Sequence, residues 1–247
     1  MSTGELSGNV AIVTGSSSGI GEAVARRLGD LGATVVVNSS NSVEAGEAVA
    51  ASIPGAIYLR ADISDREQAR SLVDQTIERF GRLDLLVNNA GWTTVVPHDD
   101  LDALTDEIFE KTFSVNVFGT WWLTKHAMPH LREASDGHVV NITSIAGHAI
   151  HPFAGSAYST SKAALSALTR EMAVEFADLG VRVNAVAPGE IETEMVGDEY
   201  EPLVNRIPMH RMGTAGEVAS AVFQLCAPDF SYVTGTEIFI TGGQHLY

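Results

Sequence analysis

The stretch VAIVTGSSSGIG at residues 10–21 decides the fold. Its first half is apolar and β-branched, which predicts a strand buried on both faces. Its second half opens a helical pattern, since apolar residues recur over 20–31 at spacings of four, four and three. The glycines between them allow a tight turn and a close approach of phosphate groups to the backbone, and the helix N-terminus offers free N–H groups. A glycine-rich turn alone is weak evidence, but its place between a strand and a helix favours a pyrophosphate-binding turn.

The same alternation of short apolar runs with longer helical patterns continues along the whole chain. It predicts a single α/β domain over residues 1–247, of the Rossmann type, with a doubly wound, parallel, seven-stranded sheet covered by helices on both faces. The least regular segment, 189–213, mixes prolines, acids and methionines, and is interpreted as a substrate flap or as an ordinary surface loop. The predicted strands are Val10–Thr14, Thr34–Asn38, Ala56–Arg60, Leu83–Asn88, His138–Thr143, Val181–Ala187 and Glu237–Ile240.

Charge and composition exclude several classes of partner. Thirty-one acidic residues against fifteen basic ones give a formal charge of −16, which repels nucleic acids and anionic membranes. No run approaches the roughly 20 apolar residues of a spanning helix, and the N-terminus lacks the pattern of a signal peptide. The one cysteine, Cys226, lies in an apolar stretch and is expected to be a buried thiol. We therefore expect a cytoplasmic protein with neither a nucleic-acid nor a membrane partner.

Tyr158 and Lys162 are the candidates for proton transfer. They lie four residues apart in a helical pattern and so share one face of the helix. A cation beside a tyrosine stabilises the phenolate and lowers the pKa of the phenol, which suits the tyrosine to exchange a proton with an alcohol or ketone oxygen. Taken alone, such a pair is usually an exposed helix face.

Several further motifs occur in the order typical of one family. These are TGSSSGIG at 14–21, Asp62-Ile63, NNAG at 88–91, Asn116, Ser144, YSTSK at 158–162, and Pro188-Gly189 with Thr193. With them the chain resembles the classical short-chain dehydrogenase/reductases over essentially its full length. The resemblance implies a nicotinamide-dependent oxidoreductase. It implies the catalytic residues Asn116, Ser144, Tyr158 and Lys162, and the cofactor-binding residues Gly15, Ser17, Ser18, Gly19, Ile20, Gly21, Asn38, Ser39, Ser40, Asp62, Ile63, Asn89, Ala90, Gly91, Tyr158, Lys162, Pro188, Gly189, Ile191 and Thr193.

The resemblance also implies a role for each catalytic residue. Tyr158 would exchange the proton, and Lys162 would lower the pKa of the tyrosine and bind the nicotinamide ribose. Ser144 would hold the substrate oxygen, and Asn116 would anchor a water that passes protons from Lys162 to solvent.

The end of the second predicted strand bears on the choice between NAD(H) and NADP(H). No acidic residue stands at Asn38, Ser39 or Ser40 to reject a 2′-phosphate, and small polar side chains are available to bind it. An arginine or lysine is missing there too. The charge argument favours NADP(H).

The substrate is less well defined by the sequence. Trp92, Ile145, His151 and Glu190 are candidate contacts, and acids at 190, 192 and 194 would disfavour an anionic substrate unless they simply face water. We therefore expect a carbonyl reductase or alcohol dehydrogenase acting on a small neutral or cationic molecule. The alternatives are a 3-oxoacyl thioester reductase and a non-catalytic, cofactor-binding regulator.

Two expectations remain: the protein has no metal site, and it forms a homotetramer. His98, His148 and His151 lack the spacing and the partners of a metal cluster. The tetramer follows from the resemblance, and Trp121 and Trp122 are expected to pack in the core or in a subunit interface. The tail 244–247 could reach a neighbouring subunit.

Overall fold

The computed structural model describes residues 4–96, 100, 102–192 and 201–246. Its strands are β1 Val10–Val13, β2 Thr34–Ser39, β3 Ile57–Arg60, β4 Leu85–Asn88, β5 Gly137–Ile142, β6 Val181–Pro188, β7 Ile191–Glu192, β8 Gly213–Thr214 and β9 Glu237–Ile240. Its α-helices are α1 Gly19–Asp30, α2 Val43–Ser52, α3 Arg66–Phe80, α4 Asp106–Phe113, α5 Thr120–Leu131, α6 Gly155–Ala177, α7 Glu201–Val204 and α8 Ala215–Cys226. The structure also contains short helical segments, which are the π-helix Ser114–Gly119 and the 3₁₀ turns Ile145–Gly147, Pro228–Phe230 and Gln244–Leu246.

One sheet of seven parallel strands forms the centre of the molecule, in the order β3-β2-β1-β4-β5-β6-β9. This confirms the predicted fold class. Each predicted strand is present with its ends shifted by no more than two residues, and the last one, Glu237–Ile240, has the predicted bounds.

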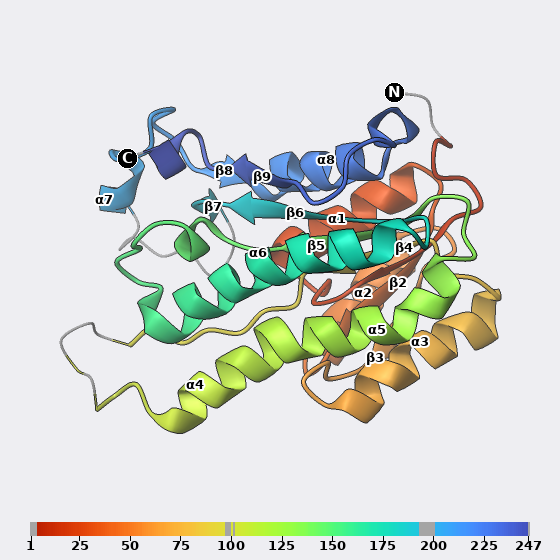
Figure 1. The fold of residues 1–247 in the computed structure, drawn as a ribbon, viewed down its shortest axis with the longest axis horizontal. Helices are drawn as coiled ribbons and strands as arrows, with labels where there is room; N and C mark the ends of the chain where they lie inside the picture. The colour runs from red at the N-terminus through yellow and green to blue at the C-terminus, as the bar shows by residue number, and fades with distance from the viewer. Residues whose placement is uncertain (1–3, 97–99, 101, 193–200, 247) are drawn as a thin grey trace.

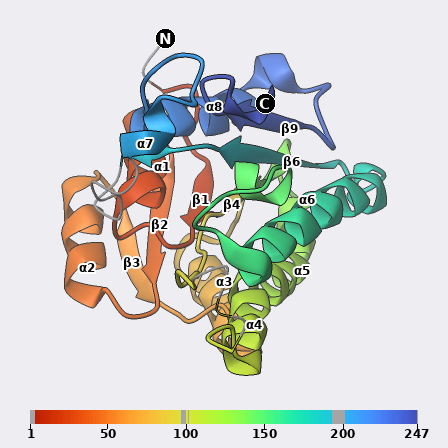
Figure 2. The same cartoon turned by 90° about the vertical axis from the view of Figure 1, so that its left-hand side faces the viewer.

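Helices cover both faces of the sheet, as Figures 1 and 2 show. One core contains buried residues of α1, α2 and α8, and the other contains buried residues of α3, α5 and α6. The periodic positions Val24, Leu28 and Leu31 are buried in the first core, and Met172 and Phe176 in the second. The helical pattern of the sequence therefore identified the faces that pack on the sheet.

The order of the strands reverses between β1 and β4, and this switch point places the ligand crevice at their carboxyl ends. The Thr14 hydroxyl group joins the two strand ends there. It accepts hydrogen bonds of 3.0 Å from the backbone N–H groups of Asn89 and Ala90. The Asn89 amide in turn donates to the carbonyl oxygens of Thr14 and Gly15, at 2.9 and 3.0 Å.

Three local features add detail that the sequence does not supply. The predicted flap is bounded by a small parallel pair, β7 with β8, while residues 193–200 lie outside the described chain. Asp65 caps α3 by accepting from two backbone N–H groups. The Gln244 and His245 side chains bind within their own chain, through Glu190 and Thr241 respectively.

Two expectations from composition can be compared with the described residues. Cys226 is buried, and burial raises the pKa of its thiol to about 12, as expected of a structural cysteine. Within the described ranges, no helix has the length and apolar character needed to span a bilayer.

Candidate active site

The glycine-rich turn leads from β1 into α1 and leaves the helix N-terminus open. Ser18 is the N-cap residue, and its side chain forms no capping hydrogen bond, so the first N–H groups of α1 remain available to an anion. Gly21 is required by packing, because a Cβ atom there would lie 2.3 Å from the Gly15 carbonyl oxygen and 2.4 Å from the Asn89 amide nitrogen. Gly15 and Gly19 have φ values of +61° and +56°, which favour glycine. This geometry fits a pyrophosphate.

Asn38 and Ser39, at the end of β2, are already engaged within the protein. Both are buried. The Asn38 amide donates to the carbonyl oxygens of Leu59 and Ala61, and the Ser39 hydroxyl group contacts the Tyr58 hydroxyl group at 2.9 Å. Of the three side chains expected to bind a ribose or its 2′-phosphate, only that of Ser40 makes no such hydrogen bond within the described part of the chain.

Arg60 is a candidate that the sequence analysis missed. It ends β3 and pairs with Ser39 across the β2–β3 ladder. Its Nε donates to the Ser40 carbonyl oxygen at 2.9 Å, which brings an exposed guanidinium group to the end of β2. The signal was hidden because Arg60 lies about twenty residues from Ser40 in the chain and becomes its neighbour only through strand pairing.

The loops after β3 and β4 form the next part of the crevice. Asp62 accepts from the backbone N–H and the hydroxyl group of Ser64, at 2.9 and 2.6 Å, which fixes its carboxylate. Ile63 is buried beside the π-helix, where a Cβ at Gly119 would lie 2.8 Å from the Ile63 carbonyl oxygen. A Cβ on Gly91 would lie 3.5 Å both from Asn116 Oδ1 and from Lys162 Nζ. The NNAG loop therefore meets two of the expected catalytic residues.

Asn116 is buried in the π-helix that joins α4 to α5. Its side chain accepts from the backbone N–H of Trp92 at 2.7 Å and donates to the Trp92 carbonyl oxygen and the Ser161 hydroxyl group, both at 3.0 Å. The amide therefore fastens the NNAG loop to α6. A π-helix leaves backbone groups out of the regular helical pattern and is frequent at functional sites.

Tyr158 and Lys162 lie near the start of α6, as their spacing predicted. Lys162 Nζ is 5.6 Å from the centre of the Tyr158 ring and donates to the Ile142 carbonyl oxygen at 2.8 Å. The lysine is buried, and burial lowers the pKa of its ammonium group from 10.5 to about 8. The pair thus combines a tyrosine that faces a cavity with a buried cation behind it.

Ser144 follows β5 and caps a short 3₁₀ turn. Its Oγ accepts from the backbone N–H of Ala146 at 3.1 Å, so the hydroxyl proton remains available to another acceptor. The cavity is lined by Ala146 and Gly147 rather than by Ser144 itself.

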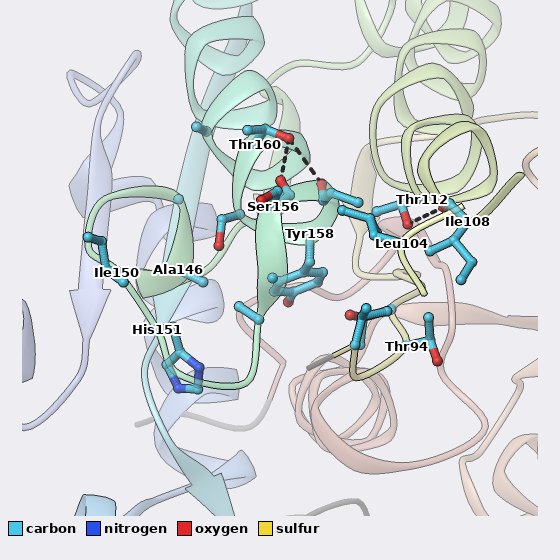
Figure 3. A pocket seen from close by; sticks show the side chains of 18 of the residues that line it. Thr94, Leu104, Ile108, Thr112, Ala146, Ile150, His151, Ser156, Tyr158 and Thr160 are labelled. Atoms are coloured by element: carbon cyan, nitrogen blue, oxygen red, sulfur yellow. Dashed lines mark hydrogen bonds between the residues drawn. The ribbon is translucent and has the colours of Figure 1, made fainter. Parts of the chain in front are cut away.

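A cavity of about 500 Å³ opens beside Tyr158. Figure 3 shows the Tyr158 ring between the turn that carries His151 and Ile150 and the segments that carry Thr94, Leu104 and Ile108. The described lining residues include no lysine or arginine. They are Thr93, Thr94, Val96, Asp100, Leu104, Ile108, Thr112, Ala146, Gly147, His148, Ala149, Ile150, His151, Ala154, Gly155, Ser156, Ala157, Tyr158, Ser159, Thr160 and Ala163.

Of the four residues expected to contact substrate, the structure places only His151 in this lining. The indole ring of Trp92 contacts Lys111, whose Nζ lies 4.4 Å from the ring centre. Ile145 is buried. Glu190 is also buried, where the sequence suggested an open acidic flap. Its carboxylate lies 2.6 Å from His151 Nε2, so it is hydrogen-bonded inside the protein and does not form an open acidic surface.

The segment after β6 adds the last expected cofactor residues. Pro188 ends the strand, and Gly189 donates its backbone N–H to the Ile240 carbonyl oxygen at 3.0 Å. Ile191 is buried in β7, while Thr193 lies outside the described residues. No group of three or more metal-ligating side chains is present among the described residues.

Comparisons with known proteins identify the family of the chain. A family model described as enoyl-(acyl carrier protein) reductase matches residues 15–245. A Streptomyces violaceoruber protein, named as a candidate ketoacyl reductase of the granaticin polyketide synthase, is 47% identical to this chain. The match covers 100% of both chains. Glucose 1-dehydrogenase 2 of Bacillus subtilis is 38% identical, over 98% of this chain and 97% of its own length.

A solved structure is similar as well. A dehydrogenase/reductase from Sinorhizobium meliloti superposes with a TM-score of 0.91 at 35% identity, covering 97% of this chain and 96% of that one. The family model, the relatives and the solved structure each match this chain over nearly its whole length. The chain belongs to the classical short-chain dehydrogenase/reductases, a family of oxidoreductases that act on CH–OH groups with NAD(P).

Proposed function

We propose that this enzyme interconverts a ketone and a secondary alcohol, with Tyr158 as the acid–base residue. One observation carries the proposal: Tyr158 lines a cavity, while Lys162 and Asn116 converge on Gly91 behind it. This supports the proposal, because Lys162 and Asn116 then lie beside the loop that follows β4, at the carboxyl ends of the strands where the glycine-rich turn also lies.

Each residue has a task that follows from its contacts. Bound NAD(P)H would supply the hydride. The Tyr158 hydroxyl group would donate its proton to the carbonyl oxygen, and Ser144 would hold that oxygen through the hydroxyl proton that its capping bond leaves available. The ammonium group of Lys162 would stabilise the phenolate that forms. Asn116 would keep the NNAG loop in place through its two bonds to Trp92.

A screen of ketones and alcohols with both cofactors, followed at the absorbance of reduced nicotinamide, tests this proposal. We expect turnover of at least one ketone, and a loss of about a thousandfold or more in kcat for Tyr158→Phe. NADPH binding should persist in that variant. A wild-type enzyme inactive on the whole panel, or a fully active Tyr158→Phe variant, would contradict the proposal.

The lining of the cavity favours a largely apolar, neutral ketone. The described lining offers no cation to a carboxylate or phosphate group. Two of its hydroxyl groups are used locally, since Thr112 donates to the Ile108 carbonyl oxygen at 2.7 Å and Thr160 to that of Ser156 at 2.6 Å. A sugar would need many free polar partners, whereas an apolar ketone would not. The relative named as a ketoacyl reductase agrees with a ketone substrate, whereas glucose 1-dehydrogenase 2 is named for a sugar.

A 3-oxoacyl thioester is the second candidate substrate. The name of that relative and the description of the family model both favour it. The net charge of −16 disfavours docking of an acidic carrier protein, so a small thioester is the more suitable probe. Comparing kcat/KM for an acetoacetyl thioester and for the matched oxygen ester distinguishes the two candidates.

We also propose that NADP(H) is preferred and that Arg60 supplies the missing cation. Its guanidinium group is exposed at the end of β2, where the ribose 2′-position of such cofactors binds. In a protein with a formal charge of −16, a local cation is needed to favour a ligand with an additional phosphate.

Arg60→Ala tests this cofactor preference through direct binding. A charge-assisted contact to phosphate is worth about 2 kcal/mol, so the NADPH dissociation constant should rise about thirtyfold while that for NADH changes little. Fluorescence titration of both reduced cofactors measures this. Arg70→Ala on α3, where Arg70 is exposed and paired with Asp74, removes the same charge elsewhere. Equal weakening of NADPH and NADH binding in Arg60→Ala would exclude the role.

Finally, we propose a cytoplasmic homotetramer. A largely apolar groove between α5 and the end of α6 supports the oligomeric state, since it is lined by Trp121, Met128, Pro129, Phe176 and Leu179 together with the basic residues Lys125 and Arg132. Such a groove is typical of a surface that packs against another subunit.

A further inference from the structure

The turn between Ser144 and Tyr158, which forms one wall of the cavity, is fastened by two imidazole–carboxylate contacts. His148 Nε2 lies 3.0 Å from Glu237 Oε2, and His151 Nε2 lies 2.6 Å from Glu190 Oε1. The side chains of the first pair are 31% and 14% exposed, and those of the second pair 13% and 6%. The His151–Glu190 contact is therefore the better shielded from water, where a hydrogen bond is stronger.

Both ring nitrogens of His151 are hydrogen-bonded inside the protein. The backbone N–H of Phe153 donates to Nδ1 at 3.2 Å, so Nδ1 is the acceptor and Nε2 carries the proton toward Glu190. A ring held at both nitrogens has one orientation. It therefore presents carbon atoms to the cavity, as part of a shaped wall, and leaves no free nitrogen for the substrate.

Glu190 is fixed from three sides. Its Oε1 also accepts from Gln244 Nε2 at 3.2 Å, and its backbone carbonyl oxygen accepts from the Gly213 N–H at 2.9 Å. It directly follows Pro188 and Gly189 in the chain. A single buried carboxylate thus joins the substrate wall, the segment after β6 and the C-terminal turn.

We propose that His151 and Glu190 form a positioning pair that sets the substrate wall relative to Pro188-Gly189 and so selects the face of the ketone that is reduced. The inference rests on the proposed function. Hydride transfer requires a closely defined geometry, and misplacement by about 1 Å can cost about a hundredfold in rate. A wall that moves relative to the segment after β6 would admit the ketone in both orientations. The stereochemistry of the product therefore reports directly on the pair.

A double-mutant cycle tests the pair on a prochiral ketone that the wild type reduces. Glu190→Leu and His151→Phe keep approximate size and remove the hydrogen bond. Each should lower kcat about tenfold, change KM less, and lower the enantiomeric ratio of the alcohol. The double variant should be no worse than the poorer single one, because the two side chains act as one unit. Glu190→Gln, which keeps an acceptor for His151, should recover most of the enantiomeric ratio.

The controls separate positioning from folding and from cofactor binding. Asp74→Leu removes the carboxylate of an exposed ion pair on α3, formed with Arg70. This control should change neither kcat nor the enantiomeric ratio. NADPH affinity, measured by fluorescence, should stay within about threefold of wild type, because the side-chain hydrogen bonds of the pair are made to each other, to Phe153 and to Gln244, and none of these four is an expected cofactor contact. An unchanged enantiomeric ratio in both single variants, or losses that multiply in the double variant, would overturn the pair while leaving the proposed function intact. A wild type without turnover would instead overturn the proposed function.

Discussion

At the scale of single residues, the candidate site depends on polar groups whose partners are decided by the surrounding structure. Lys162 is the clearest case. Its ammonium group is buried next to Tyr158 and has one backbone acceptor, the Ile142 carbonyl oxygen, among the contacts of the described residues. Burial of this group carries an energetic cost, which the protein tolerates at a position expected to act on the tyrosine.

The energetic cost of burying the Lys162 ammonium group predicts that the stability of the protein depends on pH. In the folded state the pKa of Lys162 is about 8, whereas in the unfolded chain it is near the ordinary value of 10.5. Between these values the unfolded state binds more protons, so the free energy of unfolding rises with pH. Relative to Lys162→Met, the wild type should gain about 3 kcal/mol over this window. Urea denaturation of both proteins from pH 7 to 10.5 measures the difference, and a constant difference would contradict the prediction.

At the scale of secondary-structure elements, the start of α1 is held by close contacts rather than by side-chain caps. Ser18 leaves the helix N-terminus open, while Gly21 packs directly against Gly15 and Asn89. The same atoms that keep the turn tight also join it to the loop after β4. The turn therefore depends on the sheet below it as much as on its own sequence.

Gly21→Ala should consequently damage both stability and cofactor binding. The added Cβ atom would lie 2.3 Å from the Gly15 carbonyl oxygen, which forces the backbone of the turn to shift. We expect a loss of about 2 kcal/mol in stability, as for other overpacked sites, and at least tenfold weaker NADPH binding. Gly216→Ala in α8 is the control, because the nearest atom to its Cβ would be 3.8 Å away and alanine favours helix. Equal effects of the two substitutions in denaturation and in fluorescence titration would refute this account.

At the scale of the whole molecule, apolar groups gather along α5 and α6 on one side of the sheet. Trp121 and Trp122 pack partly against the core, and Trp122 stacks with Phe118 at 6.0 Å between ring centres. Val174 on α6 is 78% exposed. Figure 1 shows that α5 and α6 run side by side, which makes them available as one surface.

Val174→Arg should weaken the proposed tetramer if this surface is its interface, because a charge would be buried without a partner. We expect a smaller species in size-exclusion chromatography with light scattering. Ser71→Arg on α3 adds the same charge at an exposed position outside α5 and α6. A tetramer that survives Val174→Arg unchanged would place the interface elsewhere.

The sequence by itself determined the strand–helix alternation, the glycine-rich turn, the helical faces and the Tyr158/Lys162 spacing. These features are local: each depends on the side-chain period of a strand or helix, or on a backbone conformation that glycine allows. Periodicity therefore predicted all seven strands of the parallel sheet.

Tertiary structure alone decided which polar side chains remain free. Asn38 and Ser39 are consumed by contacts with β3, Glu190 is buried against His151, and Arg60 reaches the end of β2 through strand pairing. Each of these contacts joins residues about twenty or more positions apart in the chain. A hydrogen-bond partner depends on proximity in space, which the register of the sheet and the packing of its loops set, and no local pattern in the sequence records it.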